Sequence, residues 1–99
     1  MKIKPSEALH QHREAIRKIL EENDVCNPRV FGSVVHGDDP LDGDLDLLVN
    51  PIKGITTLVS LGRIKRAIDT LAGVHVDVLT PNALHERFRA EVLREAVPL

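Results

Sequence analysis

Apolar residues recur at spacings of three and four between residues 5 and 23, with charged residues between them. Leu9, Ile16 and Leu20 fall on one side of a helix through this segment, and the charged residues fall on the other. An Asn-Asp pair and an Asn-Pro pair follow, and such pairs break helices. The pattern predicts an amphipathic first helix and then a short strand over residues 29–31.

Strand-like and helix-like patterns alternate along the rest of the chain. Residues 33–36 are predicted to form a helical turn, followed by the loop GDDPLDG, which is rich in turn-forming residues. Short apolar runs predict strands over residues 45–49 and 74–79. Between these strands, two adjacent threonines predict the start of a helix that ends near Gly73. Its predicted apolar stripe consists of Leu58, Leu61, Ile64, Ile68 and Leu71.

A final helix is predicted after Thr80 and Pro81, which have the form of an N-cap followed by proline at the first helical position. Its apolar stripe consists of Leu84, Phe88, Val92 and Ala96. Strands interleaved with helices indicate an α/β or α+β fold, here as a single domain over residues 1–99. We expect a small mixed sheet of about three strands with helices packed on one face.

Three acidic residues are placed to share one site. Asp44 and Asp46 stand at the start of the second strand, and side chains two apart in a strand project to the same face. Convergent carboxylates of this kind are typical of a divalent-metal site. Asp77 is the only acid of the third strand and joins the pair if the two strands lie side by side. Three carboxylates around one or two Mg²⁺ ions suit two-metal phosphoryl or nucleotidyl transfer.

A phosphate site is predicted upstream at Gly32 and Ser33, between a strand and a helical turn. Backbone N–H groups at such a helix start favour an anion. A phosphate site beside a metal site indicates a nucleotide. A merely solvated acidic loop is the alternative, but Asp46 lies inside the apolar run LDLLV, which that alternative does not explain. An EF-hand is rejected because Leu47 stands where its calcium loop requires glycine.

Composition limits the kinds of ligand and the cellular location that we expect. Thirteen basic and 15 acidic side chains nearly balance, which does not favour nonspecific binding to nucleic acid. Phe31 and Phe88 are the only aromatic residues apart from histidine, so a nucleotide base is expected to rest on aliphatic side chains. The single Cys26 rules out an intrachain disulfide, and the first 14 residues lack an apolar stretch. We expect a soluble cytoplasmic protein without membrane contact.

The spacing GS-x10-DxD, the LLV after it and the later VDVLTP resemble the minimal nucleotidyltransferases of the DNA polymerase beta superfamily. The resemblance runs from about Val30 to Val97 and implies a nucleotidyltransferase-like fold that binds a nucleoside triphosphate and Mg²⁺. The catalytic and metal-binding residues that it implies are Asp44, Asp46 and Asp77, and the phosphate-binding residues are Gly32 and Ser33. Many relatives carry Arg or Lys in the stretch that reads Val34-Val35-His36 here, so His36 is the candidate phosphate contact.

Stand-alone domains of this length are similar to the antitoxin half of MNT–HEPN toxin–antitoxin modules. The resemblance implies Mg²⁺-dependent transfer of AMP from ATP to a tyrosine of an all-helical HEPN ribonuclease, which silences that toxin. Two alternatives stay open: an antitoxin that masks its toxin without chemistry, and the catalytic subunit of a split small-molecule nucleotidyltransferase. A chain of 99 residues leaves the acceptor pocket unfinished, so we expect a heteromer or a homodimer.

Overall fold

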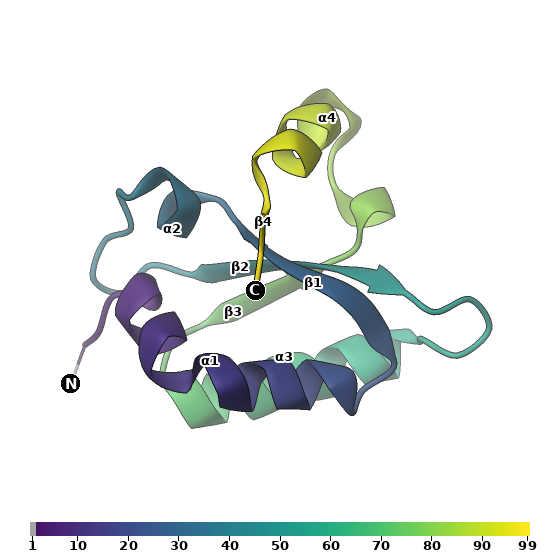
Figure 1. Cartoon of the computed structure of the whole chain (residues 1–99), viewed down its shortest axis with the longest axis horizontal. Coiled ribbons are helices and arrows are strands. Elements are labelled where there is room, and N and C mark those ends of the chain that lie inside the picture. The colour runs from purple at the N-terminus through teal and green to yellow at the C-terminus, as the bar shows by residue number, and fades with distance from the viewer. Residues whose placement is uncertain (1) are drawn as a thin grey trace.

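The computed structural model describes residues 2–99, which form a four-stranded sheet with helices on both of its sides (Figure 1). In chain order the elements are α1 (Pro5–Glu21), β1 (Val25–Phe31), α2 (Ser33–His36), β2 (Leu45–Pro51), α3 (Leu58–Ala72), β3 (Val76–Leu79), the 3₁₀ turn η1 (Pro81–Ala83), α4 (Glu86–Glu95) and β4 (Val97–Pro98). None of the helices within residues 2–99 has the length and apolar content that crossing a membrane requires.

The sheet is mixed, with the strand order β3-β2-β1-β4. β1 runs antiparallel to both β2 and β4, whereas β2 and β3 are parallel. The sequence predicted about three strands, and the fourth, β4, has only two residues, Val97 and Pro98. So short a strand leaves no alternating pattern to detect, and its proline is tolerated because β4 is an edge strand.

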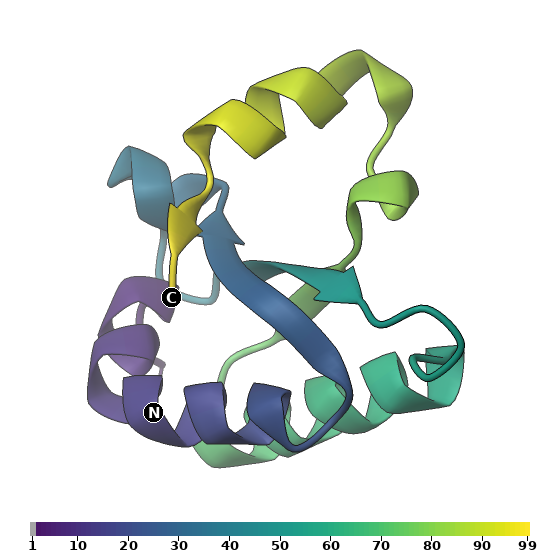
Figure 2. The same cartoon turned by 45° about the vertical axis from the view of Figure 1, so that its right-hand side comes forward.

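The core lies between the sheet and one pair of helices, α1 and α3, which cover the same face (Figures 1 and 2). Leu45, Leu47 and Val49 of β2 point into this core and are completely buried. Burial of each such side chain contributes about 1.5–3 kcal/mol. A slip of one residue would turn all three outward and Asp46 inward, so this burial sets the register of β2.

The apolar stripe of α3 differs in part from the predicted one. The buried residues of the helix are four positions apart and are Ser60, Ile64, Ile68 and Ala72. Leu58, the first residue of the helix, lies outside this set and is 86% exposed. The helix begins as predicted, because Thr57 and Ser60 form reciprocal side-chain to backbone hydrogen bonds of 3.2 Å at its N-terminus.

The predicted start of the final helix at Thr80 and Pro81 is wrong. The chain forms only the short turn η1, becomes extended at Leu84, and begins α4 after His85, whose Nδ1 accepts a hydrogen bond from the N–H of Arg87. The Arg89 guanidinium donates to the carbonyl oxygens of Pro81 and Leu84, at 2.9 and 3.0 Å, and so satisfies backbone groups at the break. In a continuous helix, backbone N–H groups four residues further on would bond to these carbonyls instead.

Helix α4 lies on the other side of the sheet from α1 and α3 in both views (Figures 1 and 2). It contains no buried residue. The helices expected on one face are therefore α1 and α3, and α4 stands apart from them. The acidic residues lie on the face of the sheet that is directed towards α4.

A candidate active site on the open face of the sheet

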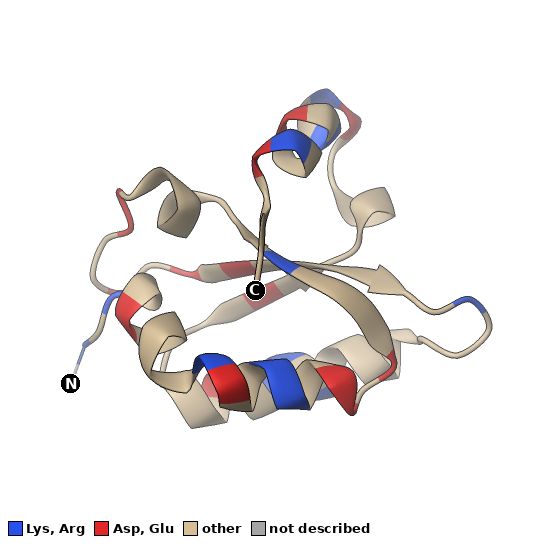
Figure 3. Cartoon of the chain, viewed as in Figure 1, with Lys and Arg blue, Asp and Glu red and all other residues tan. Residues whose placement is uncertain are grey.

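Asp46 and Asp77 are direct neighbours on the open face of the sheet. They are register partners in the parallel pair β2 and β3. Figure 3 shows acidic positions on these two adjacent strands. Asp46 is half-buried and Asp77 is exposed, so one carboxyl group is sheltered and the other is open to a ligand.

The Asp46 carboxyl group is unusually hard to ionise. Burial raises its pKa to about 6, together with the negative charges of Asp77 and Asp44 and a hydrogen bond between the Asp46 and Asp77 carboxyl groups. Two adjacent carboxylates repel each other unless a proton or a cation lies between them. The pair is therefore an electrostatic site for positive charge.

The backbone of Gly32 lies against the Asp46 carboxylate. Gly32 follows β1, whose last residue Phe31 pairs with Asp46 across the sheet. A Cβ atom on Gly32 would overlap the Oδ2 atom of Asp46, and the residue has a φ of 78°, which favours glycine. Glycine is required here both for the turn and for the space beside the acid.

Ser33 opens the one-turn helix α2 directly after Gly32. The N–H groups of Val35 and His36 both bond to the Gly32 carbonyl, at 3.0 and 3.1 Å, which holds the turn together. The predicted strand–turn–helix arrangement around Gly32 and Ser33 is thus present, next to the acidic pair.

Asp44 does not complete a triad in this structure. It is exposed and precedes the first residue of β2, Leu45. Its charge contributes to the raised pKa of Asp46, so the two are close. Nevertheless, among residues 2–99 no three acidic, histidine or cysteine side chains converge tightly enough to hold a metal ion. Three like charges repel one another when no cation lies between them.

The strand that carries Asp77 is anchored at its outer edge by α3. Asp69 Oδ1 accepts the N–H of Val76 at 2.8 Å, and Lys65 Nζ donates to the Val76 carbonyl at 2.7 Å. Lys65 and Asp69 also form an ion pair of 3.3 Å. Both edge groups of Val76 are thereby satisfied, which positions β3 and Asp77 relative to β2.

His36, the candidate phosphate contact, bonds instead to helix α4. Its Nε2 atom lies 2.9 Å from Glu95 Oε2. The hydrogen bond to Glu95 and its negative charge raise the pKa of His36. No sequence pattern predicted a role for Glu95, because it lies 59 positions from His36 and belongs to no motif.

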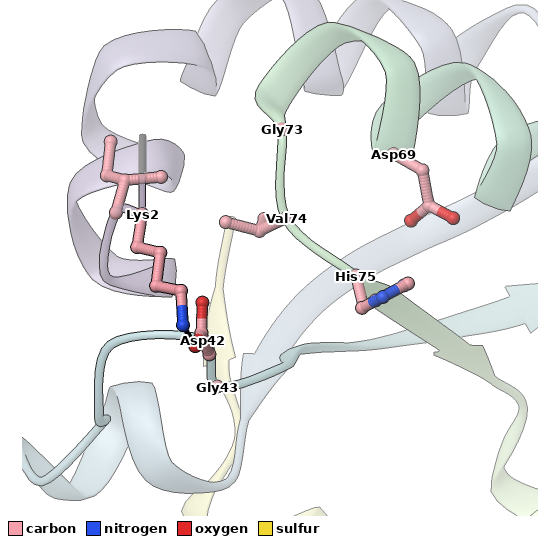
Figure 4. Close-up of a pocket in the computed structure, with 8 residues that line it drawn as sticks. Lys2, Asp42, Gly43, Asp69, Gly73, Val74 and His75 are labelled. Atoms are coloured by element: carbon pink, nitrogen blue, oxygen red, sulfur yellow. Dashed lines mark ion pairs between the residues drawn. The ribbon is translucent and has the colours of Figure 1, made fainter.

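One cavity lies between the N-terminal segment, the loop before β2 and the end of α3 (Figure 4). It has a volume of about 540 Å³ and is bordered by Lys2, Asp42, Asp69 and His75. Lys2 and Asp42 form an ion pair of 2.7 Å there, so these charges already neutralise each other. Its lining includes neither Asp46 nor Asp77. The acids predicted from the sequence to carry the chemistry therefore do not line this cavity.

Comparison with protein families and with curated proteins gives concordant matches. The model of the nucleotidyltransferase domain family matches residues 13–99. A candidate protein adenylyltransferase of Methanocaldococcus jannaschii is 32% identical over 89 residues, which cover 90% of this chain and 95% of that protein. The protein adenylyltransferase MntA of Thermococcus cleftensis is 29% identical over 89 residues, which cover 90% of this chain and 86% of that protein.

Two solved structures share the fold. A candidate minimal nucleotidyltransferase superposes with a TM-score of 0.82 at 42% sequence identity, covering 95% of both chains. A toxin–antitoxin crystal structure with AMP-PNP superposes with a TM-score of 0.72 at 16% identity, covering 86% of this chain and 69% of that one. The second match is a likeness of fold alone.

Proposed function

The chain belongs to the nucleotidyltransferase domain family, and we propose that it transfers AMP from ATP to a tyrosine of a HEPN-type toxin and thereby acts as the antitoxin. The relatives named above as protein adenylyltransferases support a protein as the acceptor. The observation that carries the proposal is the Asp46–Asp77 pair packed against Gly32.

We propose Mg²⁺ as the metal, held by Asp46 and Asp77 with Asp44 as the third ligand. Carboxylate oxygens are the donors that Mg²⁺ prefers. The raised pKa of Asp46, caused by burial and by two neighbouring acids, reflects an excess of negative charge that suits a divalent cation. When bound, the ion supplies charge neutralisation on the phosphates and activates the attacking hydroxyl.

The chain's own residues bind and orient the reactants. The Gly32–Ser33 backbone holds the β- and γ-phosphates, and the missing side chain at Gly32 lets this backbone lie directly against the Asp46 carboxylate. Asp77, the exposed acid, accepts the proton of the tyrosine hydroxyl. The tyrosine oxygen then forms a bond to the α-phosphorus while the bond to the β-phosphate oxygen breaks, so AMP is transferred and pyrophosphate leaves.

A masking antitoxin is the second candidate, and two observations favour it. Asp44 forms no three-residue metal cluster with the acidic pair within residues 2–99, and His36 is bonded to Glu95. In that case the chain neutralises its toxin by covering it, and the acids have no catalytic part.

The test incubates the purified chain with Mg²⁺, ATP labelled at the α-phosphate and a HEPN-type partner. We expect label on a partner tyrosine with the native chain, and none with Asp46→Asn or Asp77→Asn. Asp42→Asn, an exposed loop acid paired with Lys2, is the matched control and should transfer normally. Protection from the toxin by Asp46→Asn without any labelling would instead establish masking.

A further inference from the structure

A second, smaller pocket lies beside Gly32, between the end of β1 and helix α4. Its volume is about 370 Å³, which is within the range of small-molecule sites. Phe31, Gly32 and His36 form one wall. The rest of the lining comes from the C-terminal segment that includes α4 and consists of Leu84, His85, Phe88, Glu91, Val92 and Glu95.

This pocket collects aromatic rings that are far apart in the sequence. Phe31 and Phe88 are the only Phe, Tyr or Trp residues of the chain, and both line it. His85 adds a third ring, with its centroid 5.9 Å from that of Phe88. Phe88 is 51% exposed, so core packing does not account for its position.

The rim of the pocket is acidic. Glu91 and Glu95 line it together with His36, which is bonded to Glu95. Carboxylates repel phosphate groups, so a polyphosphate chain is disfavoured inside. A flat, uncharged aromatic ring suits both the apolar lining and the acidic rim, because it can stack on a ring and carry amino groups that donate to carboxylates.

Gly32 connects this pocket to the acidic pair, because it lines the pocket and also lies against the Asp46 carboxylate. A ligand with phosphates at one end and an aromatic ring at the other can occupy both places. We propose that the pocket holds the base of the nucleotide, stacked on Phe88, an assignment that rests on the proposed nucleotidyl transfer. The expectation that a base would rest on aliphatic side chains is replaced by an aromatic site.

Binding of ATP and of tripolyphosphate, which lacks the base, tests the assignment. Both are titrated calorimetrically into the native chain with Mg²⁺ present. We expect ATP to bind at least about 5-fold more tightly than tripolyphosphate, since base stacking on an aromatic side chain strengthens binding by about 5- to 150-fold. The triphosphate of 2-aminopurine riboside should lose fluorescence on binding, and the chain has no Trp or Tyr to obscure that signal.

Phe88→Ala should weaken the binding of ATP by about 5- to 150-fold and abolish the fluorescence change. The binding of tripolyphosphate should be unaffected. Leu93→Ala is the control, because Leu93 is on the same helix, is 40% exposed and does not line the pocket. Equal binding of ATP and tripolyphosphate, or native-like ATP binding by Phe88→Ala, would overturn the base site and leave the phosphate site intact. Absence of binding by both ligands would overturn the base site and the proposed transfer together.

Discussion

Asp39, in the loop that precedes the acidic strand, accepts a hydrogen bond of 2.8 Å from the backbone N–H of Ser6 in the first turn of α1. The N-cap residue of α1, Lys4, has no side-chain cap of its own. A carboxylate 33 residues away therefore caps this helix end and ties the loop before Asp44 to the scaffold.

Replacing this cap should lower the stability of the protein. Asp39→Ala is expected to reduce the free energy of unfolding by about 1 kcal/mol, because the Ser6 N–H at the start of α1 loses its hydrogen-bond acceptor. Urea denaturation followed by circular dichroism measures the change. Asp38→Ala, at the exposed neighbouring position, should leave the midpoint where it is.

The same hydrogen bond predicts a pH dependence. Burial opposes ionisation of Asp39, but hydrogen bonds from Ser6 and the charge of Lys4 outweigh it and lower the pKa below the ordinary 3.8. A lowered pKa gives a stabilisation that is present above 3.8 and lost as the pH falls through the folded value. The stability difference between the native chain and Asp39→Ala should shrink towards zero in acid unfolding series that reach this range, and a constant difference would argue against the cap.

Gly32 and Gly37 offer a matched pair of substitutions. Both have a positive φ, of 78° and 77°, but only at Gly32 would a Cβ meet the Asp46 carboxylate, since nothing lies within 4 Å of one at Gly37. Each change to alanine should cost about 1 kcal/mol of stability through the backbone. Only Gly32→Ala should also reduce AMP transfer, by at least about 10-fold, because it displaces a carboxylate from its working position. Equal losses of transfer in both variants would count against a role for the overlap.

Asp46→Asn should separate stability from activity. Removing a half-buried charge next to two other acids is expected to raise the free energy of unfolding in metal-free buffer. Added Mg²⁺ should raise the melting temperature of the native chain and have a smaller effect on the variant. Thermal denaturation with and without Mg²⁺ checks both points, with Asp42→Asn as the control acid. An identical Mg²⁺ response in all three proteins would contradict the metal assignment.

The pair between His36 and Glu95 should be visible in a histidine titration. The Glu95 hydrogen bond and charge raise the pKa of His36, and weaker contributions come from Asp38 and Glu91. The stabilisation from this raised pKa is complete below the ordinary 6.5 and is lost as the pH rises through the folded value. An NMR titration of His36 should give a pKa above 6.5 in the native chain, and Glu95→Gln should bring it closer to 6.5.

Sequence reasoning located the acidic pair because strand alternation is a local property. Asp46 and Asp77 each alternate with buried neighbours, Leu45 and Leu47 on β2 and Val76 on β3, which turns both acids to the open face. Strand alternation alone does not show that the two strands are neighbours in the sheet. Their adjacency is supplied by the parallel pairing of β2 with β3, a long-range contact that no spacing along the chain encodes.

Other features depend on long-range contacts alone and left no local pattern. The cap from Asp39 to Ser6, the bond from His36 to Glu95 and the short strand β4 all join segments that are far apart in the sequence. The gathering of Phe31 and Phe88 at one pocket belongs to the same class. Phe31 directly precedes Gly32 in the chain, whereas Phe88 reaches the same pocket from helix α4.

Helix α4 contributes nothing to the core, although both of its ends are tied to the sheet through η1 and β4. The packing of α1 and α3 on the strands does not depend on its ten residues, none of which is buried. The amide protons of α4 should therefore exchange with solvent far faster than those of α1 and α3. A ligand seated between Gly32 and Phe88 would slow that exchange, so its affinity includes the free energy needed to hold α4 still.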